Sequence, residues 1–140
     1  RLTKTYRNLE HYGNPEKILN DVEKQIRRRI LLQTKTLILT PSYLVELSDD
    51  ICAIIPLPEV LWIYDHAAMR RTIKGRQLSY TIHVVTMKGE EYTLTGKSHR
   101  EVSAIYHELN TRYPNFFFGY SKEHQEMVQY VLHEMKNEKA

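Results

Sequence analysis

The sequence predicts an α+β protein in which a leading helix precedes about seven short antiparallel strands and two closing helices. The hydrophobic period is helical up to Ile30, alternates from about Leu32 to Thr95, and becomes helical again from Ser98. Tight turns separate the alternating runs, as in an antiparallel meander. Such a meander buries its apolar face by curling into a small barrel or by packing as two sheets. We therefore expect a barrel or sandwich flanked by helices.

The size of the chain suits a single domain. Its 140 residues are enough for one core, and its apolar fraction of 41% is ordinary for soluble globular proteins. We expect one domain over residues 14–136, between a lead-in segment at residues 1–13 and a frayed tail at residues 137–140. Because the chain begins at Arg1, we expect a piece of a longer protein, with a signal peptide or a membrane anchor as candidates for what precedes it.

The predicted helices begin at recognisable caps. Asn14 and Pro15 suit the start of the leading helix. Its apolar stripe is Ile18, Leu19, Val22, Ile26 and Ile30. Ser98 and Glu101 form a capping box, and Ser121 can cap the last helix. The stripes of the closing helices are Val102, Ile105 and Leu109, then Met127, Val128, Val131, Leu132 and Met135.

The strands are predicted from short alternating or β-branched runs between turns. They cover residues 36–40, 43–47, 51–55, 60–64, 69–73, 78–86 and 91–95. The stretch Ile51–His66 is the most distinctive, with the only Trp, the only Cys and a break at Pro56–Pro58. We interpret Trp62 and the aromatic run Phe116–Phe118 as core, with a partner groove as the alternative.

Charge and cysteine content limit the classes of function. The net charge is only +3, and its excess lies in residues 1–30, which argues against a dedicated nucleic-acid binder. The single Cys52 lies in an apolar run, so we expect a buried small hydrophobe and a reducing compartment. No apolar run is long enough to span a membrane.

No catalytic or metal-binding constellation is recognisable. The histidines, at positions 11, 66, 83, 99, 107, 124 and 133, lack the spacing of metal ligands. There is no nucleophile elbow and no glycine-rich phosphate loop. We therefore predict a protein that is not an enzyme and uses no metal or cofactor.

Two basic clusters are the candidate binding sites. Arg70, Arg71, Lys74 and Arg76 lie on one predicted hairpin without an acidic residue among them, which suits recognition of phosphate. The alternative is a solvated hairpin tip. Arg27, Arg28 and Arg29 end the leading helix, where cations favour the helix dipole. These arginines either contact anionic lipid or an acidic partner, or form a solvated helix end.

The order of elements resembles the pleckstrin-homology superfold. Thr40–Leu44, Ile55–Leu57 with Val60–Tyr64, and Lys88–Tyr92 are similar to motifs of an uncharacterised bacterial family with PH-like domains. The resemblance covers roughly residues 14–135. It departs from eukaryotic PH domains because neither closing helix carries a tryptophan and the first hairpin, Pro41-Ser42, carries no basic residue.

This resemblance implies a non-enzymatic docking domain. The domain would belong to a larger bacterial protein at the cytoplasmic side of a membrane and would bind a protein partner. The alternative is direct binding of an anionic lipid or a phosphate-bearing ligand through the basic hairpin. The sequence leaves the oligomeric state open.

Overall fold

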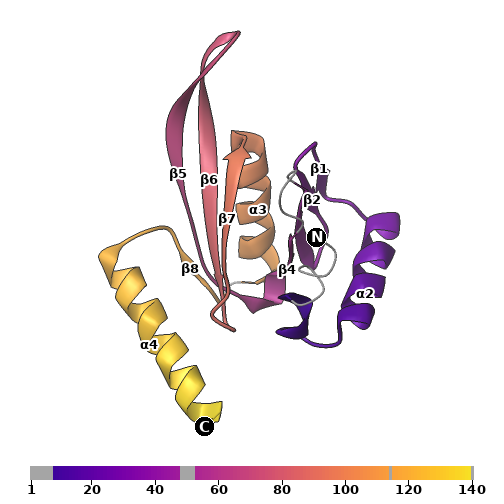
Figure 1. Ribbon diagram of the computed structural model, residues 1–140, viewed down its shortest axis with the longest axis vertical. Helices are drawn as coiled ribbons and strands as arrows, with labels where there is room; N and C mark the ends of the chain where they lie inside the picture. The colour runs from indigo at the N-terminus through magenta and orange to yellow at the C-terminus, as the bar shows by residue number, and fades with distance from the viewer. Residues whose placement is uncertain (1–7, 48–52, 114, 140) are drawn as a thin grey trace. The chain divides into compact units, whose positions relative to one another are not determined.

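The computed structural model describes residues 8–47, 53–113 and 115–139 (Figure 1). The chain divides into two compact units. The first comprises Arg1–Glu59 and Ser103–Tyr113, and the second comprises Val60–Val102 and Pro114–Ala140. The single domain predicted over residues 14–136 stays a prediction, and Cys52 lies outside the described residues.

The first unit contains helix α2 and a four-stranded antiparallel sheet. Asn14 caps α2 (Pro15–Arg28) by accepting hydrogen bonds from the backbone of Glu16 and Lys17, which confirms the predicted helix start. The strands are β1 (Leu32–Gln33), β2 (Leu37–Leu39), β3 (Tyr43–Glu46) and β4 (Ala53–Pro56), in that order. A short 3-10 helix, η1 (Leu57–Glu59), follows β4 and confirms the predicted break.

The core of the first unit includes a residue of the predicted lead-in. Residues 8–10 are helical, and Leu9 is fully buried. Leu9 packs in one cluster with Val22, Ile38, Tyr43, Val45 and Ile54. Residues 8–13 are therefore more than an extended segment. The sequence around Leu9 is polar and shows no apolar period, so only long-range packing reveals its role.

Strand β3 is buried along its whole length. Leu44 and Glu46 are as buried as Tyr43 and Val45. The Tyr43 hydroxyl donates a hydrogen bond to Asp21 at 2.7 Å. Burial, and then this carboxylate, raise the pKa of Tyr43 well above its usual value. Both faces of β3 are therefore covered.

The second unit is built on a mixed four-stranded sheet. Its strands are β5 (Val60–Thr72), β6 (Gly75–Thr86), β7 (Glu91–Lys97) and β8 (Phe117–Phe118), in the order β7-β6-β5-β8. Strand β8 pairs in parallel with β5, and the other pairs are antiparallel. The sequence predicts separate strands at 60–64 and 69–73. They form one strand because β6 pairs with β5 without a break from Trp62 to Thr72.

Two helices complete the chain. The capping box before α3 (His99–Arg112) is confirmed: the Ser98 amide donates to Glu101 at 2.8 Å, and the Glu101 amide donates to the Ser98 hydroxyl at 3.2 Å. Ser121 caps α4 (Lys122–Lys139) by accepting from the His124 amide. Helix α4 continues past Met135 to Lys139, and the predicted fraying of residues 137–140 stays a prediction.

The α+β class is confirmed, but barrel closure is wrong. Within the described residues, the eight strands form two separate sheets, and neither closes on itself. Closure requires the edge strands of a sheet to pair with each other. Among the described residues, the edge strands β1 and β4 do not pair with each other, nor do the edge strands β7 and β8. Trp62 is buried as predicted, yet it packs against Val128 of α4 rather than inside a barrel. The prediction that Phe116–Phe118 is core is wrong for Phe118, which is 45% exposed, while Phe116 and Phe117 are partly buried.

Candidate functional site

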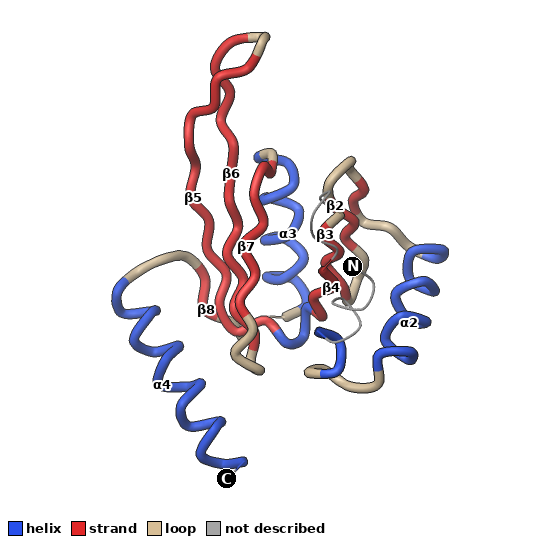
Figure 2. The backbone as a smooth tube through the Cα atoms, in the orientation of Figure 1, coloured by secondary structure: helices blue, strands red, loops and turns tan. Residues whose placement is uncertain are grey.

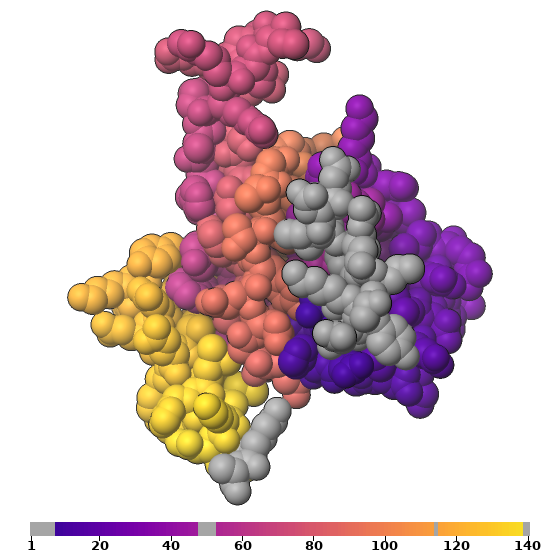
Figure 3. All heavy atoms as spheres, in the orientation of Figure 1, coloured from indigo at the N-terminus to yellow at the C-terminus, as the bar shows by residue number. Residues whose placement is uncertain are grey.

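The second unit carries a two-stranded extension of its sheet. Pairing of β6 with β7 ends at Tyr80 and Lys97, and pairing of β5 with β8 involves only Trp62 and Ile63. Among the described strands, β5 and β6 therefore pair only with each other from residue 67 to residue 79, and Figure 2 shows this hairpin extending past β7. We call residues 67–79 the basic ribbon. Its end stands clear of the other atoms of this unit in Figure 3.

A tight turn closes the ribbon at Ile73 and Lys74. The sequence places this turn one residue further on, at residues 74–76. Thr72 pairs with Gly75 across the turn, and the Thr72 hydroxyl donates to the Gly75 carbonyl at 2.9 Å. Gly75 has a φ of 115°, which residues with a Cβ rarely adopt. The glycine therefore serves the turn geometry.

The ribbon brings the four predicted cations together. Arg71 lies directly opposite Arg76 in the strand pair. Arg70 lies one step further from the turn, and Lys74 lies in the turn itself. All four side chains are exposed, and none forms an ion pair with a described residue. Like charges directly opposite each other destabilise a sheet by a fraction of 1 kcal/mol, roughly 0.2–1. A bound anion would relieve this repulsion.

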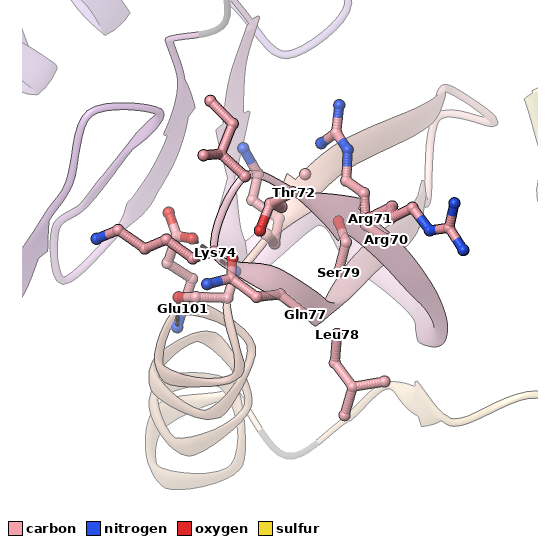
Figure 4. Close-up of a pocket in the computed structure, with 12 residues that line it drawn as sticks. Arg70, Arg71, Thr72, Lys74, Gln77, Leu78, Ser79 and Glu101 are labelled. Carbon is pink, nitrogen blue, oxygen red and sulfur yellow. Dashed lines mark hydrogen bonds between the residues drawn. The ribbon is translucent and has the colours of Figure 1, made fainter.

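A cavity of about 730 Å³ lies beside the ribbon. The ribbon contributes Arg70, Arg71 and Lys74 to its lining, and the end of β7 and the start of α3 contribute Lys97 and Glu101 (Figure 4). Arg76 does not line it. Glu101 is buried and held by the Ser98 amide, so its carboxylate serves the helix cap. In Figure 4 the Arg70 and Arg71 side chains extend away from Glu101, which leaves them available to a ligand.

The second predicted cluster is less suited to an anion. Arg28 and Arg29 line a cavity of about 380 Å³ in the first unit, together with Lys24, Arg112 and Asp21. Arg27 is exposed and does not line this cavity. The Arg112 Nε lies 2.7 Å from the Glu108 carboxylate, and the carboxylate of Asp21 faces the same space. These acids reduce the positive charge of the cavity.

Sequence reasoning missed three apolar residues of the ribbon. Met69, Ile73 and Leu78 are all exposed, although they belong to predicted strands. The sequence signal that could have revealed them is a large aliphatic residue, Ile73, at the turn between two strands that carry basic residues.

A row of stacked rings crosses the same sheet. The rings of Tyr64 and His83 stack at 4.6 Å, and those of His83 and His66 at 5.1 Å. The His83 Nε2 lies 3.3 Å from the His66 Nδ1. Burial, and then the neighbouring His66, lower the pKa of His83, while Glu91 opposes the shift.

The lowered pKa of His83 predicts weaker stability in acid. The pKa of His83 is lower in the folded protein than in the unfolded chain, so between these two values the unfolded chain binds more protons. Stability therefore falls as the pH drops below about 6.5. We expect the melting temperature to fall less between pH 8 and pH 5 for His83→Gln than for the wild type. His133→Gln, at an exposed position in α4, is the control. An equal fall in all three proteins would contradict the prediction.

The described residues contain neither a metal-ligand cluster nor a membrane-spanning helix. Across residues 8–47, 53–113 and 115–139, no three His, Cys, Asp or Glu side chains are grouped as metal ligands require. No helix in the described part of the chain combines the length and the apolar character needed to cross a bilayer.

The fold and the ribbon define an α+β protein with a candidate anion-binding surface. The model of one family, a domain of unknown function (DUF6709), matches residues 20–128, and the chain belongs to this family. The match includes the whole basic ribbon. Neither a curated protein nor a solved structure matches the chain. Membership fits the expectation of an uncharacterised family; PH-like fold and bacterial origin stay predictions.

Proposed function

We propose that this member of the DUF6709 family is a non-enzymatic binding module whose basic ribbon binds a phosphate-bearing anion. The observation that carries the proposal is the cross-strand pair Arg71–Arg76, flanked by Arg70 and Lys74, without an acidic residue in the ribbon. Two guanidinium groups on neighbouring strands can each form paired hydrogen bonds to phosphate oxygens. The phosphate can belong to a lipid headgroup or to a soluble molecule.

The proposal predicts that the ribbon cations dominate anion binding. A cation near an anionic surface contributes about 1 kcal/mol, so four contribute about 4 kcal/mol, or a factor of several hundred in affinity. We expect the variant Arg70→Ala, Arg71→Ala, Lys74→Ala, Arg76→Ala to lose binding to vesicles of phosphatidylcholine and phosphatidylserine, measured by flotation. Titration with inositol hexakisphosphate tests a soluble phosphate ligand.

A matched control separates local from overall charge. The variant Lys17→Ala, Lys35→Ala, Lys88→Ala, Lys122→Ala removes the same charge from four exposed positions outside the ribbon. We expect it to bind nearly as well as the wild type. If both variants lose binding equally, the ribbon is not the site. If the wild type binds neither vesicles nor inositol hexakisphosphate, the proposed function is wrong.

A second candidate function is docking of a protein partner on the ribbon. In the described part of the chain, residues 64–72 of β5 pair only with β6, so the other edge of β5 is unpaired there. Residues 75–79 of β6 pair only with β5, so the other edge of β6 is also unpaired. Unpaired strand edges accept an added strand from a partner. If the chain binds neither anionic probe, docking by strand addition remains as the candidate function of this ribbon.

We also propose the wider setting that the resemblance implies. The order of a leading helix, antiparallel strands and closing helices supports a PH-like relationship, without barrel closure. On this proposal the chain is a docking part of a larger bacterial protein at the cytoplasmic side of a membrane. The cations of Arg27, Arg28 and Arg29 would then be a secondary contact with the same surface.

A further inference from the structure

Three large apolar side chains are exposed among the cations of the ribbon. Ile73 in the turn is fully exposed, and Met69 and Leu78 are 61% and 54% exposed. Met69 and Leu78 lie directly opposite each other in the strand pair. Exposed apolar side chains that gather in one place mark interaction sites. A site that recognised phosphate by charge alone would not need an exposed Ile73 at the tip of the ribbon.

The apolar and basic residues lie in successive layers along the ribbon. Ile73 lies in the turn, the Thr72–Gly75 pair follows, and the Arg71–Arg76 pair comes next. At a rise of about 3.3 Å per residue, the arginines lie roughly 7 Å below Ile73. Interfacial elements bury their apolar side chains about 5–10 Å into the boundary between headgroups and acyl chains. With Ile73 at that boundary, the two arginines lie at the depth of the lipid phosphates.

We infer that the ribbon inserts its turn into an anionic membrane, with Ile73 in the acyl boundary and Arg71 and Arg76 on lipid phosphates. The inference rests on the proposed function, because it names an anionic bilayer as the source of the phosphate. Lys74 beside Ile73 can extend its ammonium group back to the headgroups while its aliphatic stem stays in the boundary. The hydrogen bond from Thr72 to Gly75 keeps the turn closed during insertion.

Removal of the apolar tip tests the inference. We expect Ile73→Ser to weaken binding to vesicles of phosphatidylcholine and phosphatidylserine by about tenfold, because it loses the transfer of one aliphatic side chain. Its affinity for inositol hexakisphosphate should not change, because all four cations remain. Met127→Ser is the matched control, since Met127 is an exposed apolar residue of α4, outside the ribbon. It should bind vesicles as the wild type does.

A depth probe gives a second readout. In a Cys52→Ser background, an environment-sensitive fluorophore on Ile73→Cys should shift to the blue with the same vesicles and be quenched by brominated acyl chains. A fluorophore on Tyr130→Cys, an exposed position in α4, should show neither effect. Absence of quenching at position 73 on vesicles that bind the protein would overturn the insertion.

The outcomes separate this inference from the proposed function. If Ile73→Ser binds vesicles as tightly as the wild type while the four-cation variant does not bind, insertion is overturned and phosphate binding stands. If the wild type binds inositol hexakisphosphate but not the vesicles, the inference that the ligand is an anionic membrane is overturned, and the proposal of phosphate binding stands. If it binds neither, both proposals are overturned.

Discussion

Trp62→Ala is expected to lower the free energy of unfolding by about 3–5 kcal/mol, the usual loss when a buried aromatic side chain is removed. Trp62 is only 6% exposed and packs with Leu61, Val85 and Val128. Its Nε1 donates to the Gly119 carbonyl at 2.9 Å, so truncation also removes one of the two hydrogen-bond contacts of this carbonyl, the other being with His124 Nδ1 at 2.9 Å. Denaturant unfolding measures the loss.

Two further variants show which interactions of Trp62 cause the loss of stability. Trp62→Phe keeps most of the packing but removes the donor to Gly119, so we expect a smaller loss than with alanine. Tyr120→Ala removes a ring that stacks on Trp62 at 6.0 Å but is 62% exposed, and we expect a change of about 0.5 kcal/mol or less. A melt unaffected by Trp62→Ala would instead favour a role for Trp62 in a partner groove.

Leu9→Ala is the second substitution with a large expected effect, about 2–5 kcal/mol. Leu9 is fully buried among Val22, Ile38 and Tyr43, and the partly buried Ile18, Leu19 and Ile26 of α2 pack against the same cluster. The cavity left by the substitution would lie at the centre of the first unit's core. Denaturant unfolding again provides the measurement.

An exposed leucine of the same unit provides the control for Leu9. Leu47 is 37% exposed at the end of β3, so Leu47→Ala should cost under about 1 kcal/mol. Similar losses for the two substitutions would mean that Leu9 is not part of the core. A chain shortened to begin at Gly13 should then be as stable as the full one.

The sequence by itself determined the local features of this protein. The cap at Asn14, the capping box of Ser98 and Glu101, and the break after Pro56 depend on interactions within a few residues, so their residue types predict them. The same holds for the cations of the ribbon, because a hairpin with a tight turn necessarily brings its two strands together. The α+β class follows from the change of hydrophobic period.

Only the tertiary structure decided which elements pair and what stays exposed. Ala67 and Ala68 weaken the strand pattern in the sequence, yet pairing with β6 makes β5 continuous through them. Leu9 is core because distant strands cover it, and the described strands form no barrel because the edge strands of each sheet do not pair with each other. Ile73 resembles a core residue in the sequence. It becomes a candidate membrane contact because the ribbon extends past β7, the neighbouring strand of its own sheet. Such long-range pairing is not encoded in a local pattern. This is the physical reason that the sequence predicted the cations of the candidate site but not the exposure of Met69, Ile73 and Leu78.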